Sequence, residues 1–312
     1  MPNLTRRDFI RLAGLAGLSA ALPAAACAPD EAAPAPGSAA PPAGAAYMAV
    51  VRGPDPEAIT RAAVEAVGGM GRFVAKGDDV ICKPNICVNY STYEYAATTN
   101  PTVVGTLVRM ALEAGAKRVR VMDTPYTSDP ETAYKTSGIQ DAVVEAGGEM
   151  EVMSQVKYAD FDLPGGRDIT SWPIYRDVVE ADVLINVPIA KHHGSARLTL
   201  GCKNLMGIIQ RPNQFHRNLH QRIADLNTLV QPALTVVDAV RILTAHGPGG
   251  GNLADVEKLD TVIASPDIVT ADAYACTLFG KTADDIPYVS LAAEMGLGEK
   301  DWTAVEVREI EL

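Results

Sequence analysis

Short β-rich runs alternate with longer helical stretches along most of this chain, and that alternation most strongly limits the folds it can adopt. The expected strands are residues 48–51, 80–82, 119–122, 150–153, 183–185, 234–237, 261–264 and 304–307. The expected helices are residues 56–70, 101–114, 138–146, 219–230, 268–279 and 289–295. This pattern predicts an α/β fold of three layers, in which helices cover both faces of a mostly parallel sheet. Residues 158–176 fit no strand–helix–strand unit and are expected to form a small inserted hairpin.

Polar side chains stand at the carboxyl ends of four expected strands, where each apolar run stops. These side chains belong to Lys83 and Asn85, Asp123, Asn186 and Asp238. If the strands are parallel, their carboxyl ends share one edge of the sheet, which is where open α/β folds bind ligands. We therefore expect one shared site at this edge. The alternative is that polar residues follow these strands only because loops are polar.

The densest group of polar residues lies in residues 191–204, where Lys191, His192, Lys203 and Asn204 are interleaved with glycines. Lysines there can neutralise an anionic substrate or cofactor, and glycines let backbone N–H groups approach it. A solvated loop is the alternative. The residues predicted to bind the ligand are Lys83, Asn85, Asp123, Asn186, Lys191, Lys203 and Asn204.

Histidines supply a second kind of chemistry. His216 and His220 are four residues apart, so on one helix they would share a face and could chelate a metal ion. No Glu lies between them as in a metalloprotease helix, so peptidase activity is not expected. Pairs at this spacing are also often incidental. The candidate catalytic residues are His192, His216, His220 and Asp238, of which His216 and His220 are also the candidate metal ligands.

Two further features lack the signatures of common cofactor sites. The glycine-rich residues 246–252 match neither a P-loop nor a dinucleotide-binding turn, so they predict a lid or a plain connector. The second feature is the set of cysteines after Cys27. They form no Cys-x-x-Cys run, so an iron–sulfur cluster is not expected within this chain. Cys82 and Cys276 are expected to be buried thiols, and a disulfide from Cys87 or Cys202 is compatible with an oxidising compartment.

The first 46 residues predict where the protein works. Residues 5–10 contain Arg6 and Arg7 before an acidic and two apolar residues, which resembles a twin-arginine export signal. The apolar residues 12–26 are too few for a membrane span of about 20 residues. Cys27 follows small residues, as at a lipidation site, although cleavage after an Ala-x-Ala is the rival interpretation. We expect residues 1–27 to be the signal, 28–46 an Ala/Pro-rich linker, and 47–312 a single α/β domain on the periplasmic or cell-surface side of a membrane.

Several motifs of the chain occur together in one known family. They are Lys83-Pro84-Asn85, Asn186-Val187-Pro188, Lys191-His192, the stretch from Thr199 to Gly207, Val237-Asp238-Ala239, Gly247-Pro248, and Asp267 to Ala273. Through these motifs, residues 48–280 resemble the domain-of-unknown-function 362 family. The resemblance implies an α/β domain with no well-established reaction. Many relatives carry a ferredoxin-type iron–sulfur domain or sit among redox proteins, whereas this chain lacks the ferredoxin cysteine run.

Charge and motifs together leave two functional classes. The net charge of −11 argues against nucleic acid as a partner, because phosphate binding needs a basic face. The first class is an enzyme, oxidoreductase or metal-assisted, that acts on or with an anionic small molecule and has a redox partner or a metal ion. The second class is a lipoprotein that binds a ligand or cofactor without turnover.

Overall fold

The structure is a computed structural model and describes residues 47–312. The predicted signal, the linker and the lipidation site at Cys27 lie outside this range. Within it, no helix combines the length and the apolar character needed to cross a bilayer.

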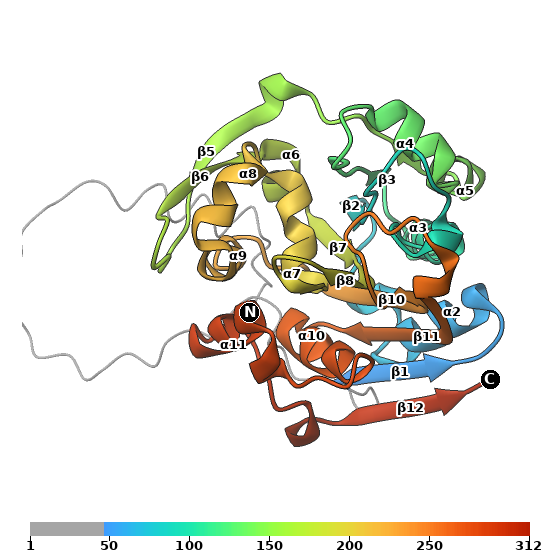
Figure 1. Cartoon of the computed structure of the whole chain (residues 1–312). Helices are drawn as coiled ribbons and strands as arrows, with labels where there is room; N and C mark the ends of the chain where they lie inside the picture. The colour runs from blue at the N-terminus through green and yellow to red at the C-terminus, as the bar shows by residue number, and fades with distance from the viewer. Residues whose placement is uncertain (1–46) are drawn as a thin grey trace, which may run out of the picture.

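A ten-stranded mixed sheet forms the middle of the domain, in the order β12-β1-β11-β10-β7-β2-β3-β4, with β8 and β9 attached beyond β10 (Figure 1). Strands β10, β7, β2, β3 and β4 are parallel neighbours, while β11 runs antiparallel to both β1 and β10. The main strands are β1 Met48–Arg52, β2 Asp79–Pro84, β3 Arg118–Val121, β4 Glu149–Met150, β7 Val183–Val187, β10 Leu234–Leu243, β11 Val256–Ser265 and β12 Val307–Glu311. The predicted three-layer α/β fold is confirmed.

Helices cover both faces of this sheet, because consecutive strand residues point to opposite faces and both faces are apolar. In β1, Met48 and Val50 join one apolar core, whereas Ala49 and Val51 join the other. The second core includes side chains of α2 Pro56–Ala66, α3 Pro101–Glu113 and α5 Ile139–Glu145. The first core includes those of α6 Arg176–Glu180, α7 Gly201–Asn204, α9 Leu219–Asn227, α10 Ile268–Thr277 and α11 Pro287–Glu294.

Local signals place several helix starts where they were expected. The side chain of Asn100 accepts a hydrogen bond from the backbone N–H of Thr102, and Pro101 occupies the first turn of α3. Asp267 caps α10 in the same way, accepting from the backbone N–H groups of Val269 and Thr270. The expected hairpin is also present, as β5 Tyr158–Asp162 paired antiparallel with β6 Ser171–Tyr175.

Other boundaries differ from expectation, and two of the following three differences affect the site. Strand β10 continues to Leu243, well past Asp238, because it pairs with the equally long β11. Strands β8 Ile189–His193 and β9 Arg197–Thr199 lie where no strand was expected. Strand β12 begins only at Val307, after a short 3₁₀ turn at Trp302–Ala304. The first two differences move predicted site residues onto strands and set the direction in which they point.

Candidate functional site

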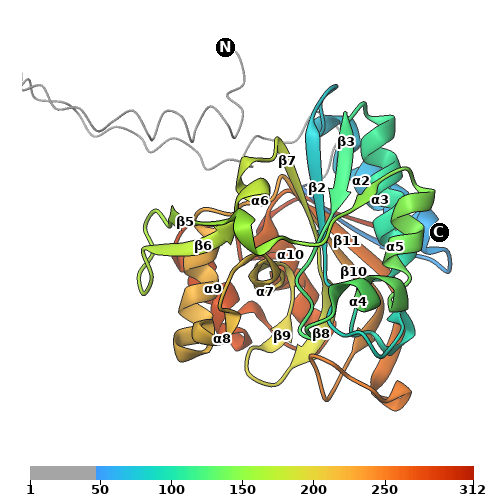
Figure 2. The ribbon, with the colours of Figure 1, turned by 90° about the horizontal axis from the view of Figure 1, so that it is seen from above.

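A cavity of about 850 Å³ lies at the carboxyl ends of β2 and β3 and is also lined by residues of β8, β9 and α7. Figure 2 shows the ribbon of these elements from above. From the predicted ligand-binding set it is lined by Lys83, Asn85, Asp123, Lys191, Lys203 and Asn204. The parallel arrangement of β3, β2 and β7 explains why residues so far apart in the sequence meet there. Asn186 lies just beneath, where its side-chain amide donates to the Gly201 carbonyl and accepts from Asn204.

Lys83 and Asp123 form a buried ion pair at the end of β2. The Lys83 ammonium lies 2.8 Å from Asp123 Oδ1 and also donates to Asn204 Oδ1 at 3.0 Å and to the Pro84 carbonyl at 2.9 Å. Burial lowers the pKa of Lys83 and raises the pKa of Asp123, and the attraction between the two charges opposes both shifts. A side chain at Gly207 would overlap Asp123 Oδ1, so the pair requires glycine there.

Lys191, on β8, uses all of its hydrogen-bond donors within the protein. Its ammonium donates to Asn85 Oδ1 at 2.9 Å, to the Ala97 carbonyl at 2.7 Å and to the Pro248 carbonyl at 3.0 Å. An ammonium group has three donors, so both Lys191 and Lys83 are saturated by protein acceptors. Within residues 47–312 all three partners of Lys191 are uncharged, so its positive charge is not neutralised by a carboxylate.

Lys203 differs from both of these lysines. It is partly buried on α7, and its ammonium has no hydrogen bond or ion pair with any side chain or carbonyl of residues 47–312. Burial, and next the positive charge of Lys191, lower the pKa of Lys203 to about 8. Lys203 therefore carries free donors into the cavity and can lose its proton near neutral pH.

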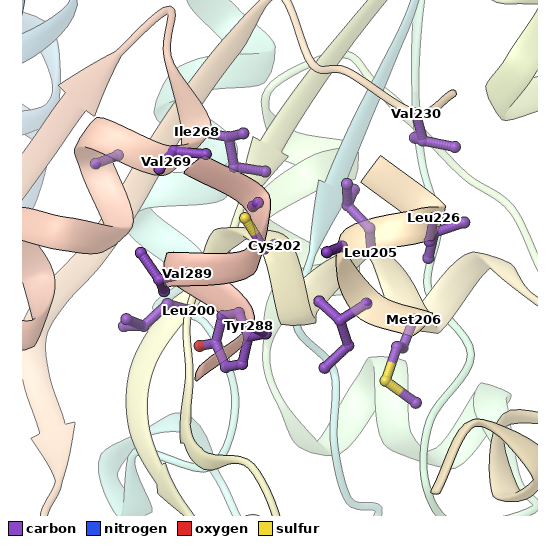
Figure 3. Packing of buried hydrophobic residues seen from close by; sticks show 14 of the residues in the cluster. Leu200, Cys202, Leu205, Met206, Leu226, Val230, Ile268, Val269, Tyr288 and Val289 are labelled. Carbon is purple, nitrogen blue, oxygen red and sulfur yellow. The ribbon is translucent and has the colours of Figure 1, made fainter. Parts of the chain in front are cut away.

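Helix α7, which carries Lys203, is anchored to α10 by buried hydrogen bonds. Its first backbone N–H groups, those of Gly201 and Cys202, donate to the buried carboxylate of Asp272 at 2.5 Å and 2.9 Å. Figure 3 shows Cys202 and Leu205 packed among apolar side chains that include Val289. This packing leaves Lys203 and Asn204 facing the cavity.

His193 lines the cavity, although His192 rather than His193 was chosen as a candidate catalytic residue. Its Nδ1 accepts hydrogen bonds from the backbone N–H groups of Ser195 and Ala196, both at 3.2 Å, so the ring proton is on Nε2. Burial and then the charge of Lys203 lower the pKa of His193 to about 3. Its imidazole therefore stays neutral, with an Nε2–H available to donate, and stacks on His216 with ring centroids 6.5 Å apart.

His192 and Asp238 do not lie among the residues lining this cavity. His192 points to the opposite side of β8 from Lys191 and His193, since alternate residues of a strand face opposite ways. It lines a second cavity of about 560 Å³, which His193 also borders, and its Nδ1 accepts a hydrogen bond from the Gly247 N–H. Asp238 is fully buried inside β10, where its carboxylate accepts from the backbone N–H groups of Asn100 and Val240. Burial raises its pKa to about 6.

His216 and His220 do not share a helix face, which contradicts the predicted geometry of a metal site. Helix α9 begins at Leu219, and Asn218 before it has a non-helical backbone (φ −149°). His216 lines the cavity, whereas His220 stacks on Tyr288 with ring centroids 6.1 Å apart. Among residues 47–312, no three His, Cys, Asp or Glu side chains are placed to hold a metal ion together.

Other residues of the cavity also escaped the sequence interpretation. Thr199 Oγ1 is buried at the cavity lining without a hydrogen-bond partner in the described part of the chain. Cys87 is a free thiol whose Sγ lies 3.5 Å from the Pro248 carbonyl. Tyr90 and Tyr126 lie at the rim. The signal that could have identified His193 is the alternation of residues 189–193, which places it on the same strand face as Lys191.

Comparisons with known proteins place the chain in a family. Thylakoid-associated protein sll1697 of Synechocystis sp. is 25% identical over 254 residues, which cover 76% of this chain and 74% of that protein. The lactate racemase apoprotein of Thermoanaerobacterium thermosaccharolyticum has a TM-score of 0.46 at 12% identity, and the match covers 78% of this chain and 59% of that one. The profile described as "Domain of unknown function (DUF362)" matches residues 80–277, well over half of the sequence. The chain belongs to the DUF362 family.

Proposed function

We propose that this cavity binds a small anionic molecule and that Lys203 contacts its charged group. The lining contains three lysines and one carboxylate, so it is positively charged within a protein whose net charge is −11. Lys83 is paired with Asp123, and Lys191 is held by uncharged acceptors. The free ammonium of Lys203 is the observation that carries the proposal, because a desolvated cation without a partner is costly unless a ligand supplies one.

Two uncharged donors support the same interpretation. Thr199 Oγ1 lacks a partner, and buried hydroxyls normally have one. His193 offers its Nε2–H because its Nδ1 is occupied by backbone donors. Together with Lys203, these groups offer hydrogen-bond donors to the oxygens of a carboxylate or phosphate.

The proposed chemistry is proton transfer to or from the bound anion, with Lys203 as the acid or base. A pKa of about 8 allows Lys203 both to hold and to release a proton near neutral pH. His193, with a pKa of about 3, serves as a neutral donor rather than as the base. Lys83 and Asp123 serve as a fixed ion pair that contributes to the electrostatic potential at the Lys203 ammonium.

A binding protein without turnover is the second candidate, and one observation favours it. Among the residues lining the cavity, the only carboxylate is that of Asp123, which is paired with Lys83 rather than with a histidine. The cavity lining therefore lacks the histidine–carboxylate pair of many acid–base enzymes. Hydrogen exchange of a bound ligand into deuterated solvent separates the two candidates, because only the enzyme catalyses it.

We further propose that the domain acts outside the cytoplasm, tethered to a membrane through Cys27. The twin-arginine motif and the small residues before Cys27 support this location. The name of the thylakoid-associated relative agrees with a membrane location. Detergent partitioning of the full chain, compared with a Cys27→Ala variant, tests the tether; equal partitioning of the two would reject it.

Calorimetric titration with carboxylates and phosphates tests the binding proposal. Replacing Lys203 with Met removes the charge while keeping the length of the side chain, and binding should weaken by about 10- to 150-fold, as expected for a charge-assisted hydrogen bond worth about 1.5–3 kcal/mol. Binding to the parent should also weaken as the pH rises above about 8, because Lys203 then loses its proton. The matched control is Lys117→Met at an exposed position outside the cavity. Equal affinity of the Lys203→Met variant and the parent would refute the proposal.

A further inference from the structure

The cavity is much larger than the anionic group that Lys203 would hold. Its volume of about 850 Å³ is in the range of sites for drug-sized ligands, about 300–1,000 Å³. Lys203, Thr199 and His193 account for only a part of its lining. A ligand that fills the cavity would also contact the other residues of its lining.

Two exposed tyrosines form the part of the lining that is chemically most unusual. Among residues 47–312, Tyr90 and Tyr126 are the only Phe, Tyr or Trp side chains that are largely exposed, at 64% and 80%. Both line this cavity. Aromatic side chains usually bury most of their ring, so two exposed rings at the mouth of one cavity indicate a surface that a ligand covers.

The protein holds these two tyrosines at the same mouth although they come from different loops. Tyr90 follows β2 and Tyr126 follows β3, and the backbone N–H of Tyr126 donates to the Cys87 carbonyl at 2.8 Å. The Tyr90 hydroxyl lies against Gly249, where even a Cβ atom would come within 2.8 Å of it. The glycine-rich loop is tied to the cavity floor in turn, because the Pro248 carbonyl accepts from Lys191.

We infer that the ligand is an aromatic phosphate or carboxylate, with its anionic group at Lys203 and its flat ring stacked on Tyr90 and Tyr126. This inference rests on the proposed function, and it adds the chemical class of the part of the ligand that does not contact Lys203. Aromatic faces stack on planar rings with little dependence on ring identity, so the tyrosines would select for a ring rather than for one particular compound. The Lys203 ammonium and the donors of Thr199 and His193 would select for the negatively charged group of the ligand.

Matched pairs of probes test this inference by calorimetry. Phenyl phosphate is compared with glycerol phosphate, and benzoate with cyclohexanecarboxylate, so that each pair shares its charged group. In at least one pair the aromatic member should bind about tenfold more tightly, as expected for one stacked ring. The pair that shows the difference identifies the anionic group as phosphate or carboxylate.

Variants of the two tyrosines test whether they cause the difference in affinity between aromatic and non-aromatic probes. The Tyr90→Ala/Tyr126→Ala double variant should lose the aromatic preference, while the Phe double variant should keep it because the rings remain. Val156→Ala, at an exposed position outside the cavity, is the control.

Four outcomes would contradict the inference, the proposed function or both. If anions bind through Lys203 but the aromatic members bind no better, or if the Ala double variant keeps the preference, the inference is wrong and the proposed function stands. If binding does not depend on Lys203, the proposed function fails. If no probe binds the parent, both are refuted.

Discussion

Replacing Lys83 with Met would leave the Asp123 carboxylate buried without its cation. The two side chains are 0% and 3% exposed and lie 2.8 Å apart, so water does not replace the lost partner. Removing one member of a buried ion pair costs about 3–5 kcal/mol. Asp123 keeps hydrogen bonds from the Ile86 and Thr124 backbone N–H groups, which places the expected loss of unfolding free energy near the lower end, about 3 kcal/mol.

The pH dependence of this loss gives a sharper test. Burial already raises the Asp123 pKa, and loss of the Lys83 charge raises it further. A carboxyl group whose pKa is higher in the folded state destabilises the fold once the pH exceeds its unfolded pKa, and the penalty grows until the folded pKa is passed. The Lys83→Met variant should therefore lose less stability at pH 5 than at pH 8.

Urea unfolding followed by circular dichroism at both pH values measures these effects. Adding Asp123→Asn to Lys83→Met removes the unpaired charge, so the double variant should lose less stability than the sum of the two single variants. A loss below about 1 kcal/mol at pH 8, or a loss that does not change with pH, would refute the account of Lys83 and Asp123 as a buried pair.

Two more substitutions test the geometry of the site. Gly207→Ala should separate Asp123 from Lys83 and lower the melting temperature, because the added methyl overlaps the carboxylate; an unchanged melting temperature would show that the pair can move aside. His216→Ala should weaken ligand binding with little effect on stability, whereas His220→Ala should lower stability with little effect on binding, because only His216 lines the cavity. Thermal melting and calorimetry of each variant measure both effects, and similar results for the two histidines would contradict their separation.

The sequence alone was sufficient for the layers of the fold and for the grouping of several residues of the candidate site. Apolar alternation and helix caps are local signals, so they placed β2, β3, β7 and α3 close to their observed limits. Because the carboxyl ends of parallel strands lie at one edge of a sheet, the sequence alone predicted that Lys83 and Asp123 lie close together.

Tertiary structure decided which way each of these side chains points and what it contacts. A strand turns alternate residues to opposite faces, so recognising β8 is what separates His193 from His192. The backbone at Asn218 breaks the helix that His216 and His220 were expected to share.

The roles of the lysines depend on partners far away in the sequence. Lys191 is saturated by the carbonyls of Ala97 and Pro248, and Lys83 by Asp123 and Asn204, whereas Lys203 keeps its donors free. No local pattern distinguishes these three residues, because hydrogen-bond saturation is set by the acceptors that the fold brings within reach. The sequence therefore determined that lysines gather at this edge of the sheet, and only the tertiary structure decided which of them keeps its hydrogen-bond donors free.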